Sequence, residues 1–205
     1  MYKFSALIIL ICLPSICIAE NNYLQLRVEA GSNKEDGIGF FGTRTILENT
    51  SLKNWTLGSK IGTGKDGYTY INPYALYKIG KIKVGSIYLH DSFNSESIGP
   101  IIRYSNVLEN ISANFEYSYN IDTRGKNNLH DLWINVSQNK QAGLKIGSEI
   151  WYYHYADGTE NLKLRPIKLS YVIPNSITPF VMLQRHWNDR GIVTDAILGG
   201  IEIKF

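Results

Sequence analysis

Apolar and polar residues alternate with a period of two through most of this chain. The pattern is clearest between residues 110 and 122, where every second residue is apolar. These apolar positions are Ile111, Ala113, Phe115, Tyr117, Tyr119 and Ile121. Because successive side chains of a β-strand point to opposite faces, this stretch predicts a strand of about twelve residues, about twice the usual length in soluble sheets. No comparable stretch repeats with the 3.6-residue period of a helix, so we predict an all-β chain.

Polar and glycine-bearing turns cut the chain into about twelve strands. The predicted strands cover residues 23–30, 38–47, 54–62, 68–78, 82–91, 98–106, 110–122, 128–137, 142–155, 163–173, 177–187 and 193–205. The alternating longer and shorter connectors are typical of an antiparallel up-and-down meander. We predict a closed antiparallel barrel of about twelve strands, with ten or eight as alternatives. Pro73, Pro100, Pro166 and Pro179 fall inside these strands, and we expect them near strand ends or at bulges.

The first nineteen residues have the features of a signal peptide. Lys3 gives a positively charged start, an apolar run follows, and Ala19 ends a small-residue cleavage site. The apolar run is shorter than the roughly twenty residues that a membrane-spanning helix needs. We therefore expect residues 1–19 to be removed and residues 20–205 to form a single transmembrane β-barrel domain.

Composition narrows the class of the mature protein. Both cysteines, Cys12 and Cys17, lie in the predicted leader, so the mature chain has no thiol for a disulfide or a metal site. Its formal charge falls from +3 to +2 when Lys3 is left out, which is too balanced for a nucleic-acid-binding surface. No apolar segment after residue 19 is long enough for a transmembrane helix, so this chain can cross a membrane only with strands.

A soluble barrel of the lipocalin type would also alternate, with its apolar face turned inward. Three features favour an outer face in lipid. The strands are long, and aromatic residues such as Trp55, Tyr68, Tyr152 and Trp187 lie near strand ends, where membrane barrels have aromatic girdles. The polar face carries charges in mid-strand, which a dry core accepts only when they are paired. We predict that this face lines the interior.

The last strand ends in Ile201-Glu202-Ile203-Lys204-Phe205, which resembles the assembly signal of bacterial outer-membrane proteins. Twelve strands in under two hundred residues, with Thr178-Pro179-Phe180 opening the penultimate strand, resemble the small monomeric porins for acidic sugars, the oligogalacturonate and sialic-acid channels. This resemblance implies a channel for passive diffusion of small hydrophilic solutes, with anionic oligosaccharides among the candidates. The arginine-rich lumen of that family is represented here only by Arg27, Arg103 and Arg44, mixed with acidic residues.

Barrel diameter grows with strand number, and twelve strands leave room for solute when the lining is polar. The charged residues predicted to line the pore are Arg27, Lys60, Arg103, Glu116, Lys145 and Glu149. The predicted outer loops are short, so selectivity would come from wall residues, and an adhesin with extended loops is disfavoured. The alternative is a plugged barrel in which these charges pair across the lumen and serve structure alone.

An outer-membrane enzyme that modifies lipid, of the lipid A deacylase type, is the rival from another class. All four histidines lie near the predicted outer ends of strands, and His154-Tyr155-Ala156-Asp157 resembles a segment of that family. Ala156 stands where the family has its serine nucleophile, so we predict no catalytic residue. No two histidines have a short ligand spacing, and we expect no metal site and no cofactor.

The expected location is the bacterial outer membrane, after export through the periplasm. The expected partners are outer-membrane lipid and lipopolysaccharide, a small hydrophilic solute, and the outer-membrane assembly machinery, which would bind the strand that ends in Phe205. No nucleic-acid partner is expected.

Overall fold

The computed structural model describes residues 22–33, 37–64, 68–93, 95–125, 127–173, 177–187, 191 and 193–204. The predicted signal peptide and Phe205 lie outside these residues. Among the residues that the structure describes, no helix has the length and apolar character that a membrane crossing requires.

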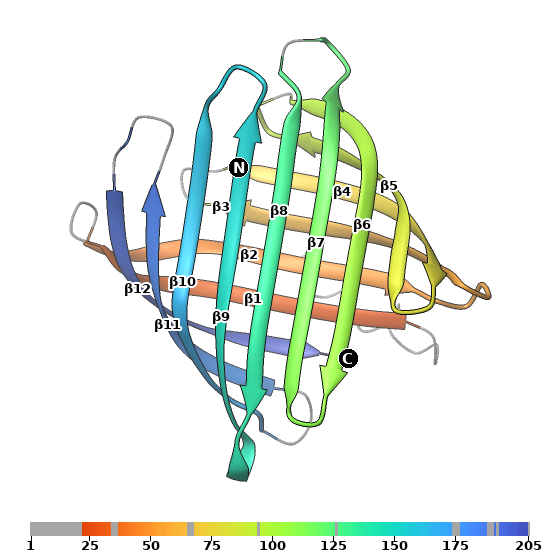
Figure 1. The fold of residues 1–205 in the computed structure, drawn as a ribbon. Helices are drawn as coiled ribbons and strands as arrows, with labels where there is room; N and C mark the ends of the chain where they lie inside the picture. The colour runs from red at the N-terminus through yellow and green to blue at the C-terminus, as the bar shows by residue number, and fades with distance from the viewer. Residues whose placement is uncertain are drawn as a thin grey trace, which may run out of the picture.

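Twelve antiparallel strands close into one barrel, in which each strand pairs with its neighbours in sequence and β1 pairs with β12 (Figure 1). The strands are β1 (Asn22–Asn33), β2 (Gly37–Asn49), β3 (Trp55–Gly64), β4 (Thr69–Ile79), β5 (Ile82–Asp91), β6 (Glu96–Leu108), β7 (Ile111–Asp122), β8 (Leu129–Asn139), β9 (Leu144–Tyr155), β10 (Glu160–Tyr171), β11 (Ile177–Trp187) and β12 (Val193–Lys204). The predicted fold class and strand count are confirmed. The predicted strand ends differ from these by no more than three residues.

The alternation places polar residues inside and most large apolar residues outside. On β7, Ile111 and Ile121 are exposed on the outer face, whereas Glu116 and Asn120 are buried and face inward. Residues that pair directly across two strands lie on the same face of the sheet. Glu116 pairs with Arg103 on β6 and with Trp133 on β8, so these two residues also face inward. The outer face is therefore a continuous apolar surface of the kind that contacts hydrocarbon.

The prolines are accommodated in two ways. Pro166 lies at a register shift between Arg165 and Lys168 on β10, as expected for a bulge. Pro73 and Pro100 lie within strands and are exposed, and Pro179 keeps a regular register opposite Ile201 on β12.

The ends of the barrel differ in their connections. Gln25 near the start of β1 pairs with Lys204 at the end of β12, so both terminal strands meet the same end. At the opposite end, the β7–β8 and β9–β10 loops are joined because the Asn127 amide donates to the carboxylate of Asp157 at 2.7 Å. The backbone N–H of Thr159 also donates to this carboxylate and lowers the pKa of Asp157, which keeps the carboxylate charged.

The interior is not polar throughout, which corrects the expectation of a wholly polar inner face. One buried apolar cluster comprises Tyr74, Leu76, Ile87 and Ile101 on β4, β5 and β6. A second comprises Phe180, Met182, Ala196 and Leu198 on β11 and β12, on the opposite side of the barrel. These strands carry apolar residues on both faces, so alternation alone does not show which apolar residues face inward. The polar lumen lies between the two clusters.

Inward glycines allow aromatic rings to lie flat against the barrel wall. At Gly62, an added Cβ would lie 2.5 Å from both the backbone oxygen of Thr43 and Cζ of Tyr70. Gly62→Ala should therefore lower the free energy of unfolding by about 1–3 kcal/mol, the usual cost of overpacking. Gly199→Ala is the control, since its Cβ would meet only the Phe180 oxygen at 3.7 Å. Urea unfolding of both variants in the same detergent compares them, and equal midpoints would contradict the packing argument.

Candidate functional site

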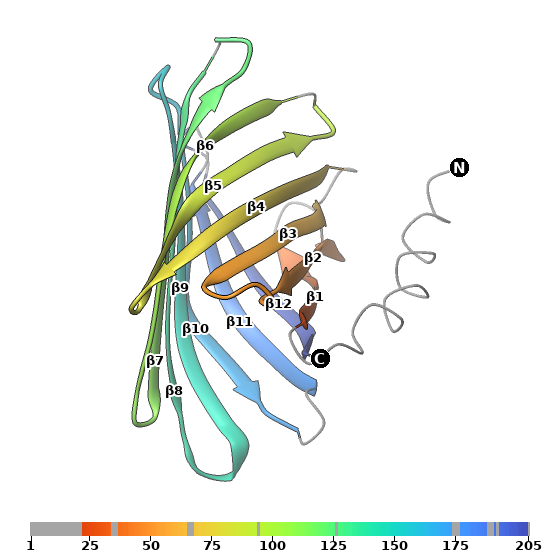
Figure 2. The same ribbon diagram turned by 90° about the vertical axis from the view of Figure 1, so that its right-hand side faces the viewer.

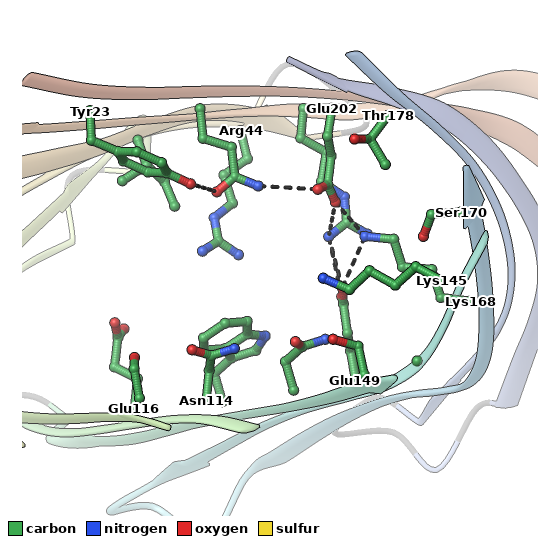
Figure 3. Close-up of a pocket in the computed structure, with 18 of the residues that line it drawn as sticks. Tyr23, Arg44, Asn114, Glu116, Lys145, Glu149, Lys168, Ser170, Thr178 and Glu202 are labelled. Carbon is green, nitrogen blue, oxygen red and sulfur yellow. Dashed lines mark hydrogen bonds and ion pairs between the residues drawn. The ribbon is translucent and has the colours of Figure 1, made fainter. Parts of the chain in front are cut away.

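The barrel encloses two cavities, of about 450 Å³ and about 670 Å³. The smaller cavity, drawn in Figure 3, lies toward the end where the chain termini meet and is lined by Tyr23 and Thr178. The larger lies toward the opposite end and is lined by Tyr68 and Asn127. Four residues line both cavities, namely Arg27, Arg44, Glu116 and Trp133. We call these four the shared layer, because any solute that moves between the cavities must pass them.

All six residues predicted to line a pore face the interior. The smaller cavity is lined by Arg103, Lys145 and Glu149, and the larger by Lys60. The remaining two, Arg27 and Glu116, belong to the shared layer. Whether these side chains contact a permeating solute stays a prediction.

The first group of charges, which we call the Glu149 cluster, comprises Arg27, Glu29, Glu149, Arg165, Lys168 and Glu202. Glu149 is at its centre and is only 3% exposed. Its carboxylate accepts from Arg27 at 3.0 Å and from Arg165 at 3.0 Å, and Lys168 lies 3.4 Å away. Lys168 also pairs with Glu202. Three cations and three carboxylates therefore neutralise one another.

The second group, which we call the Glu116 cluster, comprises Glu48, Lys60, Tyr74, Arg103 and Glu116. Arg103 donates through Nε to Glu116 at 2.9 Å and through Nη1 to Glu48 at 2.5 Å. Lys60 also pairs with Glu116, and the Tyr74 hydroxyl donates to Glu48 at 2.6 Å. This cluster also has no net charge.

Both clusters reach across the lumen. Arg27 on β1 meets Glu149 on β9, and Lys60 on β3 meets Glu116 on β7, so each pair joins strands four places apart around the barrel. Figure 2 shows β7 to β10 as one wall and β1, β2 and β12 as the wall that faces it. The cross-lumen pairing expected for the plugged alternative is thus present, and it narrows the interior to the space between the clusters.

Arg44 lies in that space. It comes from β2, and its guanidinium carbon lies 5.5 Å from the ring centroid of Trp133 on β8 and 5.1 Å from that of Trp151 on β9. These strands are on the opposite wall, so the Arg44 side chain crosses the lumen (Figure 3). In the part of the chain that the structure describes, Arg44 forms no ion pair with a carboxylate. It is held by cation–π contacts with two indole rings.

Several interior residues were missed by sequence reasoning. Arg165 and Lys168 are three positions apart and would face opposite ways in a regular strand, and only the bulge at Pro166 turns both inward. Trp133 and Trp151 occupy inward positions, although aromatic residues near strand ends predict the outer girdle. Had the strand register been known, the position of Trp133 opposite the inward Glu116 would have indicated that Trp133 faces inward.

No protein-family model and no curated protein sequence matches this chain. Solved structures with the same fold include porins. A KdgM porin shares 17% identity at a TM-score of 0.58, over 89% of this chain and 99% of that one. A KdgM porin in complex with disordered oligogalacturonate shares 17% identity at a TM-score of 0.59, over 89% of this chain and 99% of that one. A NanC porin shares 15% identity at a TM-score of 0.59, over 88% of this chain and 100% of that one. The resemblance to acidic-sugar porins predicted from sequence is therefore matched by the fold.

Two histidines of the barrel are hydrogen-bonded to groups other than a serine hydroxyl. His130 contacts the hydroxyl of Tyr117 at 2.8 Å, and His154 contacts Glu160 at 3.0 Å. Ser92, in the triad-like His90-Asp91-Ser92 segment, accepts the backbone N–H of Thr69. Within the described ranges, no group of three His, Cys, Asp or Glu side chains is placed to hold a metal ion.

Proposed function

We propose that this protein is an outer-membrane porin through which small hydrophilic solutes diffuse passively, with anionic oligosaccharides among the candidates. The observation that carries the proposal is a closed barrel containing two cavities that meet at one shared layer. A barrel of the same fold has been solved in complex with oligogalacturonate, which supports a saccharide as the solute. In this proposal the pore-lining residues are Arg27, Lys60, Arg103, Glu116, Lys145 and Glu149.

The proposal includes export and membrane insertion. Residues 1–19 would direct export and then be removed, leaving residues 20–205 as one barrel domain. The outer face would contact outer-membrane lipid and lipopolysaccharide, because side chains such as Ile98 and Ile197 are 52% and 59% exposed there. The β12 strand would bind the assembly machinery.

The charge of the smaller cavity supports passage of anions. Its cationic side chains are Arg27, Arg44, Lys83, Arg103, Lys145 and Lys168, and its acidic ones are Glu48, Glu116, Glu149 and Glu202. Because the wall around this cavity has a low dielectric constant, the excess of cationic side chains raises the local concentration of anions in the cavity.

Single-channel recording tests the proposal against a plugged barrel. Purified protein in a planar lipid bilayer should give discrete conductance steps whose reversal potential in a salt gradient favours anions. The sample should first be shown to be folded by its heat-modifiable mobility in detergent gels. Folded protein that inserts without conductance steps would establish the plugged barrel instead.

We infer in addition that the protein is not an enzyme. His130 bonds to Tyr117 and His154 to Glu160 rather than to a serine hydroxyl, and Ala156 occupies the position of the deacylase nucleophile. Both observations weigh against lipid A hydrolysis, which needs a nucleophile bonded to its base.

A further inference from the structure

We propose that the larger cavity is a binding track for pyranose rings, which recognises a sugar by its ring faces and hydroxyl groups and not by its charge. The inference rests on the proposed channel function and names the class of solute that the cavity holds. It extends the solute class to neutral oligosaccharides.

Aromatic side chains line this cavity from its mouth to the shared layer. They are Tyr68, Tyr70, Trp133, Trp151, Tyr153 and Tyr155, which we call the aromatic wall. Phe93 at the rim is 72% exposed and stacks on Tyr68, with ring centroids 5.6 Å apart. At the inner end, the rings of Trp133 and Trp151 lie 6.4 Å apart. The C–H faces of a pyranose are apolar, so stacking on such rings removes apolar area from water.

Polar atoms of the same cavity have no partner. The indole N–H groups of Trp133 and Trp151, Oδ1 of Asn72 and Nε2 of His186 are buried, and none is hydrogen-bonded to another described residue. Buried polar atoms are normally paired, so these donors and acceptors mark positions for groups of a ligand or for water. Sugar hydroxyls both donate and accept, and they match this mixture of neutral groups.

Charge does not distinguish solutes here as it does in the smaller cavity. Acidic and cationic side chains line the larger cavity in numbers that differ by one. Two of these cations are also held in ion pairs, since Arg165 pairs with Glu29 at 2.9 Å and Lys60 pairs with Glu116. The volume of about 670 Å³ lies within the roughly 300–1,000 Å³ typical of small-ligand sites.

Calorimetric titration of the folded, detergent-solubilised barrel tests the track with three probes. The probes are maltotriose, which is neutral, trigalacturonic acid, which is anionic, and sorbitol, which has hydroxyls but no ring. We expect saturable binding of both trisaccharides with similar affinity and no binding of sorbitol. Trp133→Leu and Trp151→Leu should each weaken maltotriose binding by roughly tenfold, as loss of an aromatic stacking platform does.

Trp55→Leu is the matched control, because Trp55 lies on the outer face and is 43% exposed, so affinity should be unchanged. A barrel that binds trigalacturonic acid but not maltotriose would overturn the proposal, since the site would then recognise charge. Absence of all saccharide binding in a barrel that still conducts would overturn the track and leave the channel intact. Saccharide binding by a barrel without conductance would instead overturn the channel and retain the track. The wild-type titrations decide these outcomes even where a Trp variant does not fold.

Discussion

Glu149→Gln is expected to lower the free energy of unfolding by about 3 kcal/mol, the lower end of the cost of breaking a buried ion pair. Glu149 is 3% exposed and holds Arg27, Arg165 and Lys168 around one carboxylate. Without the Glu149 charge, these three cations keep only two carboxylates as partners, those of Glu29 and Glu202. The lower end applies because Arg165 still pairs with Glu29 and Lys168 with Glu202. Equilibrium urea unfolding of the detergent-solubilised barrel measures the change.

Two further variants separate charge from position. Glu109→Gln lies in an exposed turn and should leave the unfolding midpoint unchanged. Arg27→Leu combined with Glu149→Leu removes one cation with the carboxylate, and should be more stable than Glu149→Gln because no buried charge is left without its partner. A Glu149→Gln barrel as stable as the wild type would show that the cluster is hydrated and contributes little.

The fold was largely predictable because lipid on one side and polar lumen on the other impose one rule on every strand. β7 follows that rule over its whole length, and its bounds were predicted to within one residue. The rule fails at the two interior apolar clusters, where strands such as β4 and β11 have apolar residues on both faces. There, Leu76 and Met182 each pack within their own cluster inside the barrel, and this packing depends on how neighbouring strands are arranged in three dimensions.

The inward orientation of six charged residues was predictable, but their partners were not, and Arg165, Lys168, Trp133 and Trp151 were missed. Arg27 and Glu149 are separated by 122 positions, and their contact depends on closure between β1 and β12 and on the stagger of every strand between them. The bulge that turns Lys168 to the inner face also changes this stagger. The only sign of the bulge in the sequence is a proline. The position of Arg44 was equally unpredictable, because it depends on contacts with two indole rings from the opposite wall.

Arg44→Ala is expected to raise the single-channel conductance and to weaken anion preference. The side chain crosses the lumen at the shared layer, so its removal widens the passage between the cavities. A unit positive charge about 4 Å from an ion stabilises an anion and destabilises a cation by about 1 kcal/mol each, even in bulk water. Loss of the Arg44 charge should therefore lower the anion-to-cation permeability ratio by about thirtyfold. Conductance steps and reversal potentials in a salt gradient measure the two effects separately.

Arg44→Lys separates the effect of the positive charge from the effect of the guanidinium group that narrows the passage. It keeps the cation but loses the planar group that stacks on Trp133 and Trp151, so anion preference should persist while conductance rises. Arg185→Ala is the control, because Arg185 is exposed on the outer face, where it pairs with Asp195 at 2.6 Å. Wild-type conductance and reversal potential in Arg44→Ala would place the narrowest point elsewhere. The shared layer would then not be where solutes are selected, because a charge at that layer acts on every ion that passes.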